Sequence, residues 1–461
     1  MDHAPDVRTF PFSAFPAHEK NCKLPKFPLA NLEKSVTLYS WYRKPPTYLT
    51  YCRERKPVHE TVHRYINMAE SYTCFDKLTA HTHTFKKVTK KKRIGVVRTD
   101  NHGLIYAYCL GKADRYEALQ ASTQLYILEN KFEPVIPLRD TEIVGCYRQE
   151  LIDCPQWERE NYEKAKNGAD NAAWTAEAFS KAFNCPIYES LDEMADPELF
   201  DGILIGNCSW YGEDHVELAM PFIKKGIPIF IDKPFASNAK DAALLLKAAR
   251  EYNCPVFCSS ILYYDDMNRA LLDKKLGKTH LVVSTFGASM HQRNASVHTL
   301  SALLGAVRYS NGDDYKVESI TYIGTGDPTQ SRGSTSDGAK EPHNEIYRVE
   351  FADGTLGILN MEGFGHYAFH VEVYAETGIS SEYSVEQSLR GGIVEISYDF
   401  AKMIDTRIPP IEYDRIFEFV ATIDAGLRSR EEGRTVTLQE IADEAGWTFG
   451  ISDKPAEEEK K

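Results

Sequence analysis

Asp232-Lys233-Pro234 is the stretch of this sequence best placed to do chemistry, because it follows a short apolar run from Ile227 to Ile231. Such a run is typical of a strand in a parallel sheet covered on both faces. Pro234 has no N–H and cannot continue a strand, so Lys233 falls at a carboxyl end, where open α/β sheets bind ligands. An ammonium group there could stabilise negative charge developing on a substrate oxygen. The simpler alternative is a solvated surface lysine.

His298 is a second candidate, in the segment His291 to Leu300 that precedes an apolar helix. An imidazole titrates near neutral pH and could accept or relay a hydroxyl proton. On position alone, a histidine at a helix start is more often a cap or rim residue. The pair His81 and His83 has no Cys, Asp or Glu constellation beside it, so we expect no metal site.

Strand and helix patterns alternate around Lys233. Asn238 is expected to cap a helix, and Val256 to Cys258 to form the next strand, which completes a βαβ unit. Three earlier apolar runs fit further strands: Arg93 to Val97, Thr141 to Tyr147 and Gly202 to Ile205. This alternation predicts an α/β fold whose N-terminal domain is doubly wound and Rossmann-like, around a parallel sheet.

Two positions in this domain depart from a dinucleotide-binding pattern. The turn Arg98 to Gly103 falls where such folds carry G-x-G-x-x-G, but Arg98 and Asp100 stand at the first two glycine positions. At the end of the second strand, Tyr147 and Arg148 replace the acid that holds the ribose of NAD. That absence favours a 2′-phosphate, hence NADP, or no dinucleotide. The alternative is a Tyr and an Arg at a sheet rim with no such role.

Hairpin signals mark the second half of the chain. Ala352-Asp353-Gly354 separates the strand patterns Ile346 to Phe351 and Thr355 to Met361. We expect an α+β domain with a mainly antiparallel open sheet, one face covered, and a helix near Ile411 to Arg428 that returns to the first domain. The uncovered face favours a homodimer or homotetramer. The predicted division is an N-terminal arm over 1–91, domains over 92–260 and 261–445, and a polar tail over 446–461.

Composition narrows the function classes. The 461 residues are 43% apolar with a net charge of −13, which argues against nucleic-acid binding. No apolar run approaches the ~18 to 20 residues of a membrane helix, and the first residues lack the order of a secretion signal. The ten cysteines form no CxxC pair, so neither disulfides nor zinc are expected, and a reducing cytoplasm fits best.

The central segments resemble one family. They are Asp201-Gly-Ile-Leu-Ile, His215-Val-Glu-Leu-Ala and Gly226-Ile-Pro-Ile-Phe-Ile-Asp-Lys-Pro-Phe-Ala. Together they are similar to the Gfo/Idh/MocA family, the glucose–fructose oxidoreductase and inositol dehydrogenase group. Its signature is a strand ending in Glu-Lys-Pro after a helix that starts with His; here Asp232 replaces the Glu. The resemblance extends over about 92–443, and Ser429-Arg-Glu-Glu-Gly-Arg-Thr-Val436 looks like the family's closing segment.

The resemblance implies an NAD(P)-dependent enzyme acting on a secondary alcohol of a sugar, polyol or glycoside. Lys233 and His298 match the catalytic positions, and Asn294 stands where the family often has an Asp. The substrate side of the site is expected to include Tyr263, Tyr264, His291 and Asn294. The positions expected to hold NAD or NADP are Thr99, Asn101, His102, Gly103, Tyr147, Arg148, Asn207, Cys208, Ser209, His215, Asp232 and Lys233.

Two other functions remain compatible with these residues. A tightly held cofactor could oxidise the sugar transiently during an elimination or epimerisation and then reduce it again. Alternatively, the chain could be a binding or regulatory protein without a dinucleotide, a reading that Arg98 and Asp100 favour and that Lys233 and His298 oppose.

Overall fold

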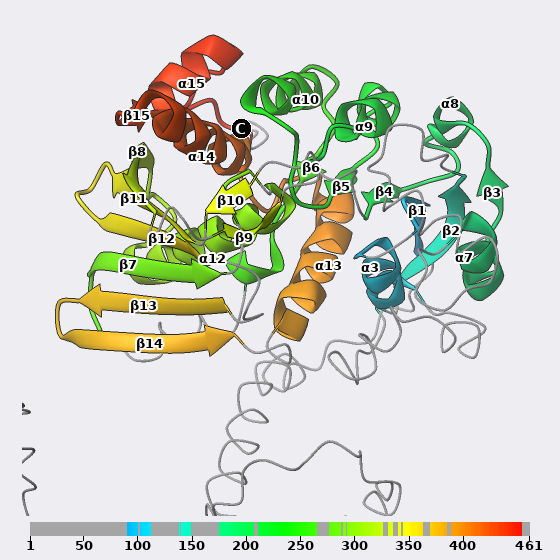
Figure 1. Ribbon diagram of the computed structural model, residues 1–461. Coiled ribbons are helices and arrows are strands. Elements are labelled where there is room, and N and C mark those ends of the chain that lie inside the picture. Colours follow the sequence, from blue (N-terminus) through cyan, green and yellow to red (C-terminus); the bar gives the residue numbers. More distant parts are fainter. Residues whose placement is uncertain are drawn as a thin grey trace, which may run out of the picture. The chain divides into compact units, whose positions relative to one another are not determined.

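The computed structural model describes residues 90–99, 102–111, 138, 140–148, 175–206, 211–264, 276–286, 289–291, 293–325, 331–334, 340–342, 344–362, 369–384 and 389–453. All of them belong to one compact unit, Lys87–Lys461. The predicted arm over 1–91 lies almost entirely outside the described residues. Element labels follow Figure 1.

A six-stranded sheet occupies the first half of this unit, with the strand order β3-β2-β1-β4-β5-β6. All of its strand pairs are parallel. The strands are β1 (Lys92–Val97), β2 (Thr141–Tyr147), β3 (Ile187–Tyr188), β4 (Gly202–Ile205), β5 (Ile229–Ile231) and β6 (Val256–Phe257). This is the strand order of doubly wound dinucleotide-binding folds, so the predicted Rossmann-like domain is confirmed.

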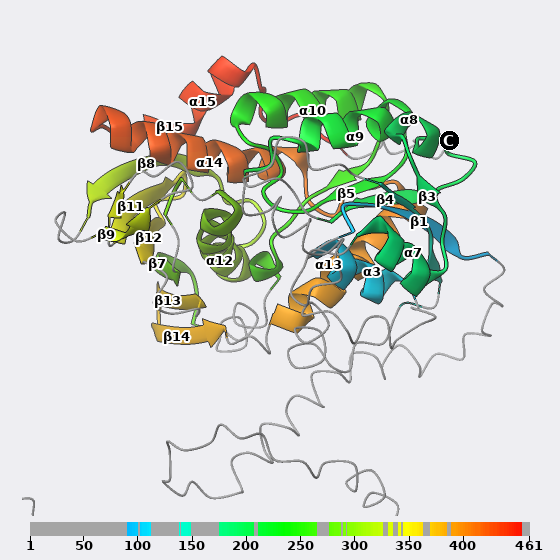
Figure 2. The ribbon, with the colours of Figure 1, turned by 45° about the vertical axis from the view of Figure 1, so that its right-hand side comes forward.

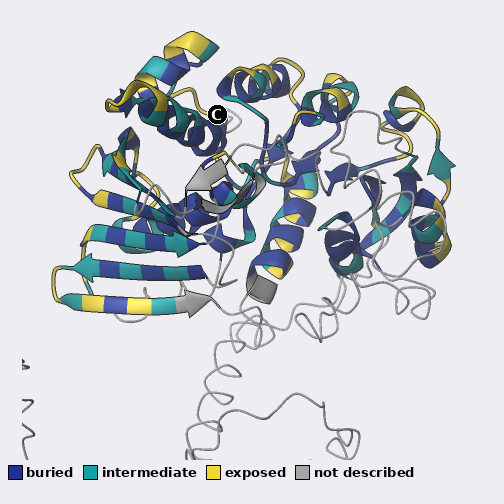
Figure 3. Ribbon diagram, in the orientation of Figure 1, coloured by how far each residue is buried: buried dark blue, intermediate teal, exposed yellow. Residues whose placement is uncertain are grey.

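Helices cover both faces of this sheet. Figures 1 and 2 show three of them over one face: α8 (Leu191–Met194), α9 (His215–Lys224) and α10 (Ala239–Glu251). The other face carries α3 (His102–Leu110), α7 (Ala176–Phe183) and α13 (Leu389–Thr406). With both faces covered, the strands β4, β5 and β6 are buried throughout, whereas the edge strand β3 is half-buried, as Figure 3 shows.

The local sequence explains the helix nearest the central strand. Asn238 accepts a hydrogen bond from the backbone N–H of Asp241 and so caps α10, as predicted. Leu245, Leu246 and Ala249 then lie on the buried stripe of the helix. This stripe fixes α10 on the sheet and with it the loop that follows β5.

A seven-stranded sheet fills the second half, with the order β14-β13-β7-β12-β11-β8-β15. Its strands are β7 (Thr279–Phe286), β8 (Val317–Gly324), β11 (Asn344–Phe351), β12 (Leu356–Glu362), β13 (Phe369–Ala375), β14 (Gly378–Ser384) and β15 (Val436–Thr437). The predicted hairpin is present, with Gly354 at a φ of +85° in its turn. The sheet is mainly antiparallel, as predicted, except that β12 pairs with β7 in parallel.

The remaining elements are a two-stranded sheet, a 3₁₀ turn and three helices that have not yet been described. The short strands β9 (Ser331–Ser334) and β10 (Lys340–Pro342) pair with each other, and the 3₁₀ turn η3 (Ile261–Tyr263) follows β6. The helices are α12 (Arg293–Asn311), α14 (Tyr413–Glu432) and α15 (Leu438–Ala445). Asp424 on α14 accepts a hydrogen bond from the backbone N–H of Ala239, so this helix does return to the first domain. Beyond α15, Trp447 is buried and stacks on Phe417.

Candidate active site

Lys233 lies where the sequence places it, at the carboxyl edge of the parallel sheet. Ile229, Phe230 and Ile231 are fully buried, and the N–H of Asp232 still bonds to the carbonyl of Ile205 on β4. The ladder then stops because Pro234 has no N–H to offer; the Lys233–Pro234 peptide bond is cis. Lys233 is half-buried and faces the elements of the second half of the chain.

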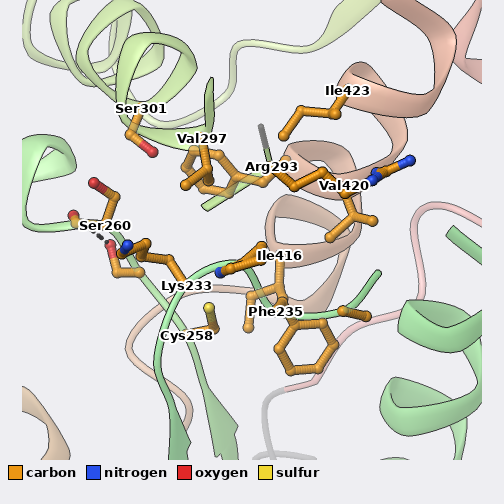
Figure 4. A pocket seen from close by; sticks show the side chains of 14 residues that line it. Lys233, Phe235, Cys258, Ser260, Arg293, Val297, Ser301, Ile416, Val420 and Ile423 are labelled. Carbon is orange, nitrogen blue, oxygen red and sulfur yellow. Dashed lines mark hydrogen bonds between the residues drawn. The ribbon is translucent and has the colours of Figure 1, made fainter. Parts of the chain in front are cut away.

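A small cavity marks the place where those elements meet (Figure 4). Its wall is formed by the ends of β5 and β6, with Lys233 and Ser260, and by α12 and α14, with Val297 and Val420. The cavity has a volume of about 10 Å³, room for about one water molecule and not for a sugar. It therefore identifies the junction beside Lys233 rather than a substrate pocket.

His298 reaches the same junction from α12. Its Nδ1 lies 2.7 Å from Oγ of Ser260, which also accepts a hydrogen bond of 3.2 Å from the backbone N–H of Leu262. Burial, followed by the positive charges of Lys233 and His102, holds the pKa of His298 well below its usual value. The imidazole is thus neutral at neutral pH and has a ring nitrogen able to accept a proton.

His102 and Asp232 form a second polar pair at this edge. Nδ1 of His102, at the start of α3, lies 2.7 Å from Oδ2 of Asp232, whose side chain is 1% exposed. The other carboxylate oxygen, Oδ1, is buried and has no hydrogen-bond partner among the described residues. A buried acceptor without a partner costs free energy unless a ligand or water supplies the donor, so this oxygen suits a hydrogen-bonding ligand at the edge.

The turn before α3 keeps its shape without the first glycine of the dinucleotide pattern. Arg98 adopts a φ of +65°, the left-handed conformation that glycine normally supplies, and its buried side chain pairs with Asp214 at 3.0 Å. Gly103 packs against Gly206 so closely that a Cβ on Gly206 would lie 2.0 Å from the Cα of Gly103. The close helix–strand packing that the third glycine serves in such folds is therefore present.

At the other end of the same edge, Arg148 follows β2. Its Nε lies 2.9 Å from the carboxylate of Glu189, and its Nη1 contacts the carboxylate of Glu177 on α7. These partners raise the pKa of the guanidinium further, the contact with Glu177 contributing most. Burial, the largest single influence, raises the pKa of Glu177, but the hydrogen bonds from Arg148, the backbone and Thr175, together with the charge of Arg148, lower it on balance.

The sheet order, the α3 turn and the unpaired Asp232 oxygen together fit a bound dinucleotide. Residues 144–260 match the model of an oxidoreductase family with an NAD-binding Rossmann fold, Gfo/Idh/MocA. The resemblance to the Gfo/Idh/MocA family is confirmed. The matched family is described as oxidoreductases with an NAD-binding fold. The predicted nicotinamide dinucleotide cofactor and the predicted oxidoreductase class are therefore both confirmed.

Solved structures of inositol dehydrogenases share the fold. Myo-inositol dehydrogenase from Lactobacillus casei, in complex with NAD(H) and myo-inositol, is 16% identical with a TM-score of 0.53, covering 79% of this chain and 99% of its own. Myo-inositol 2-dehydrogenase from Lactobacillus plantarum is 12% identical with a TM-score of 0.53, covering 76% and 99%. Scyllo-inositol dehydrogenase from Lactobacillus casei, with NAD(H) and scyllo-inositol, is 14% identical with a TM-score of 0.51, covering 76% and 100%. No curated protein matches the chain in sequence.

The structure brings several predicted Gfo/Idh/MocA site residues together. Lys233, His298, His102 and Asp232 form one cluster, and Gly103 and the buried Thr99 belong to the adjoining turn. His215 is fully buried, with Nδ1 3.2 Å from the carbonyl of Phe235 in the loop after β5. This contact holds the loop that follows β5 and contains Lys233.

Other predicted residues lie elsewhere. Tyr263 and Tyr264 are buried: the hydroxyl of Tyr263 pairs with that of Tyr315 at 3.2 Å, and Tyr264 faces Asp399. His291 is exposed in the turn before α12, and Tyr147 is half-buried at the end of β2. Asn101, Asn207, Cys208, Ser209 and the side chain of Asn294 lie outside the described residues.

Sequence reasoning missed Ser260, Asp214 and the two glutamates that hold Arg148. Ser260 had a usable signal, because it follows β6 and the carboxyl ends of parallel strands meet at one edge. Asp214 and Glu177 had none, since each pairs with a residue far along the chain.

Two further searches bear on the function. None of the helices that the structure describes is long and apolar enough to cross a membrane. Among the described residues, no three His, Cys, Asp or Glu side chains gather as metal ligands would.

Proposed function

We propose that this protein is an NAD(P)-dependent dehydrogenase that oxidises a secondary alcohol of a sugar, polyol or glycoside. The observation that carries the proposal is the convergence of Lys233 and His298 at the carboxyl edge of an NAD-type sheet. Lys233 follows β5 in the first half of the compact unit, and His298 lies on α12 in the second half. The fold, and not the local sequence, therefore brings the ammonium group and the neutral imidazole near each other. A cation can stabilise the alkoxide that develops during alcohol oxidation and a base can accept the hydroxyl proton, while a dinucleotide would accept the hydride.

Each residue has a distinct task in this proposal. The ammonium group of Lys233 donates a hydrogen bond to the reacting oxygen and stabilises the negative charge that develops on it. His298 accepts the hydroxyl proton, which its lowered pKa permits because the ring is unprotonated at neutral pH. Ser260 holds the ring through Nδ1. The substrate loses a hydride from carbon and a proton from oxygen, and becomes a carbonyl compound.

The cofactor would be held by this chain's own edge residues. The backbone of the turn at Arg98 and Thr99 and the start of α3 would face its pyrophosphate, as helix N-termini do in such folds. Asp232 would accept a hydrogen bond through its unpaired Oδ1. When bound, the nicotinamide supplies the hydride acceptor.

Binding and turnover test the proposal in that order. NADH and NADPH are titrated against the full chain by nucleotide fluorescence, and a panel of inositols, hexoses and glycosides is then assayed with both oxidised nucleotides. We expect binding of at least one nucleotide and net nucleotide reduction with at least one polyol or sugar. Binding without net reduction, but with conversion of a sugar, would replace the proposal by redox-neutral chemistry. Absence of nucleotide binding would refute it.

The open face of the second sheet supports a homo-oligomer. Ile379, Tyr374, Leu281 and Leu356 are paired in register across four neighbouring strands and point to this face; Ile379 is 66% exposed. An apolar row across a sheet is a common protein–protein contact, and a second copy would cover it. We propose a homodimer or homotetramer in the cytoplasm. Light scattering should give two or four times the 52.3 kDa of the chain, and Ile379→Lys should lower that mass.

A further inference from the structure

Arg148 occupies the position that distinguishes NAD from NADP in doubly wound folds. Val96 of β1 is level with Cys146 of β2, and Arg148 follows β2 at the same carboxyl edge at which Arg98 begins the turn before α3. In such folds the residue just after the second strand meets the ribose: an acid accepts hydrogen bonds from the ribose hydroxyls of NAD, whereas a nearby Arg binds the 2′-phosphate of NADP. By residue type alone, Arg148 favours NADP.

The partners of Arg148 change this expectation. Glu189, which follows β3, lies 2.9 Å from Nε through either carboxylate oxygen, and Glu177 of α7 contacts Nη1. The backbone N–H of Arg148 also bonds to the carbonyl of Tyr188, which sets β2 and β3 in register at this point. The guanidinium is therefore held between two carboxylates that come from the elements on either side of it.

Among the residues that the structure describes, the cluster of Arg148, Glu177 and Glu189 has a net negative charge, since two carboxylates outweigh one guanidinium. We infer that the cluster of Arg148, Glu177 and Glu189 makes this protein select NAD over NADP. A 2′-phosphate, with about two negative charges, would be repelled by the carboxylates, whereas ribose hydroxyls can donate to them. The inference rests on the proposed function in one respect, that a dinucleotide binds at this sheet edge.

The test compares dissociation constants of NADH and NADPH for the full chain, measured by fluorescence titration and checked by calorimetry without any substrate. We expect the wild-type protein to bind NADH roughly tenfold more tightly than NADPH at low salt. The double variant Glu177→Gln/Glu189→Gln frees the guanidinium and should bring the two constants together or invert them. Because the three side chains are 32%, 58% and 65% exposed, screening at about 1 M salt should also reduce the wild-type preference.

A matched control removes the same charge elsewhere. The variant Glu217→Gln/Glu251→Gln changes two exposed carboxylates on α9 and α10 and should keep the wild-type ratio. A wild-type preference for NADPH, or an unchanged ratio in the Glu177→Gln/Glu189→Gln variant, would overturn the inference while leaving the dehydrogenase proposal intact. Binding of neither nucleotide would refute both.

Discussion

The two ends of the parallel sheet's carboxyl edge use charge in opposite ways. At the β5–β6 end, His298 is 8% exposed and Asp232 1% exposed, and each has a close polar partner at 2.7 Å. At the β2–β3 end, Arg148 is 32% exposed and pairs with two carboxylates that are more exposed still. Buried groups interact strongly and are poorly screened, whereas exposed groups interact weakly and over a range that salt controls.

The difference separates two tasks. The buried end fixes protonation states and positions, which is what bond-making steps require. We propose that the exposed end only influences which dinucleotide is bound. We therefore expect substitutions at the buried end to reduce turnover by large factors with little change in nucleotide affinity. Substitutions at the exposed end should change nucleotide preference and leave turnover with NAD almost unaltered.

The largest effect is expected for Lys233→Met. Methionine keeps much of the side-chain volume but cannot donate a hydrogen bond or carry charge, so kcat should fall by at least about a hundredfold. Affinity for NADH, measured by fluorescence, should change little. Lys225→Met, at the exposed end of α9, is the matched control and should keep wild-type turnover. A kcat for Lys233→Met within a few-fold of wild type would contradict the assignment of the buried end to catalysis.

His298→Gln is expected to be next in size. Glutamine can form hydrogen bonds but cannot take up a proton, so kcat should fall by about 10²-fold at neutral pH. The control is His280→Gln, on the exposed side of β7. Steady-state kinetics at two or more pH values measure the effect. If the acid limb of the pH–kcat profile were the same in the variant and in wild type, His298 would not be the proton acceptor.

Ser260→Ala sharpens the comparison within the buried end. It removes a hydroxyl that touches both Nδ1 of His298 and the N–H of Leu262, so the ring loses its anchor while the acceptor remains. We expect kcat to fall about tenfold with KM nearly constant. Ser260→Thr retains the hydroxyl and should restore most of the activity. Equal losses in the Ala and Thr variants would indicate a packing defect rather than lost positioning.

The fold could be predicted well from sequence because it depends on local patterns. The apolar runs at β1, β4 and β5, the Asn238 cap and the Gly354 hairpin each carry a signal within a few residues. The parallel pairing of β7 with β12 carries no such signal, since the two strands are far apart in the chain and only the assembled sheet sets their register.

The sequence predicted the residue types of the site well, but it predicted poorly how those residues pair and what net charge results. Lys233 and His298 were predicted as site residues and lie near each other, whereas Ser260, which contacts the imidazole ring of His298, was not predicted. Arg98 and Arg148 were taken as signs against NAD, because their partners Asp214, Glu177 and Glu189 are distant in sequence. Charge at a site is a property of the whole cluster, and long-range ion pairs leave no local pattern.

The smallest expected effect concerns the free energy of unfolding. It tests whether the imidazole of His298, at the β5–β6 end of the sheet edge, is shielded from solvent as its burial indicates. Burial lowers the pKa of His298 in the folded protein, whereas the unfolded chain should titrate near pH ~6.5. Below that pH the unfolded chain binds a proton that the folded protein refuses, so stability falls as pH drops from about 6.5 towards the folded pKa. Between pH 7 and 5 this single group should cost at most about 2 kcal/mol. Urea unfolding at pH 7, 6 and 5 should show a shallower pH dependence for His298→Gln than for wild type or His280→Gln. Parallel curves for all three proteins would mean that solvent reaches the imidazole, and the contrast between the two ends of the sheet edge would lose its physical basis.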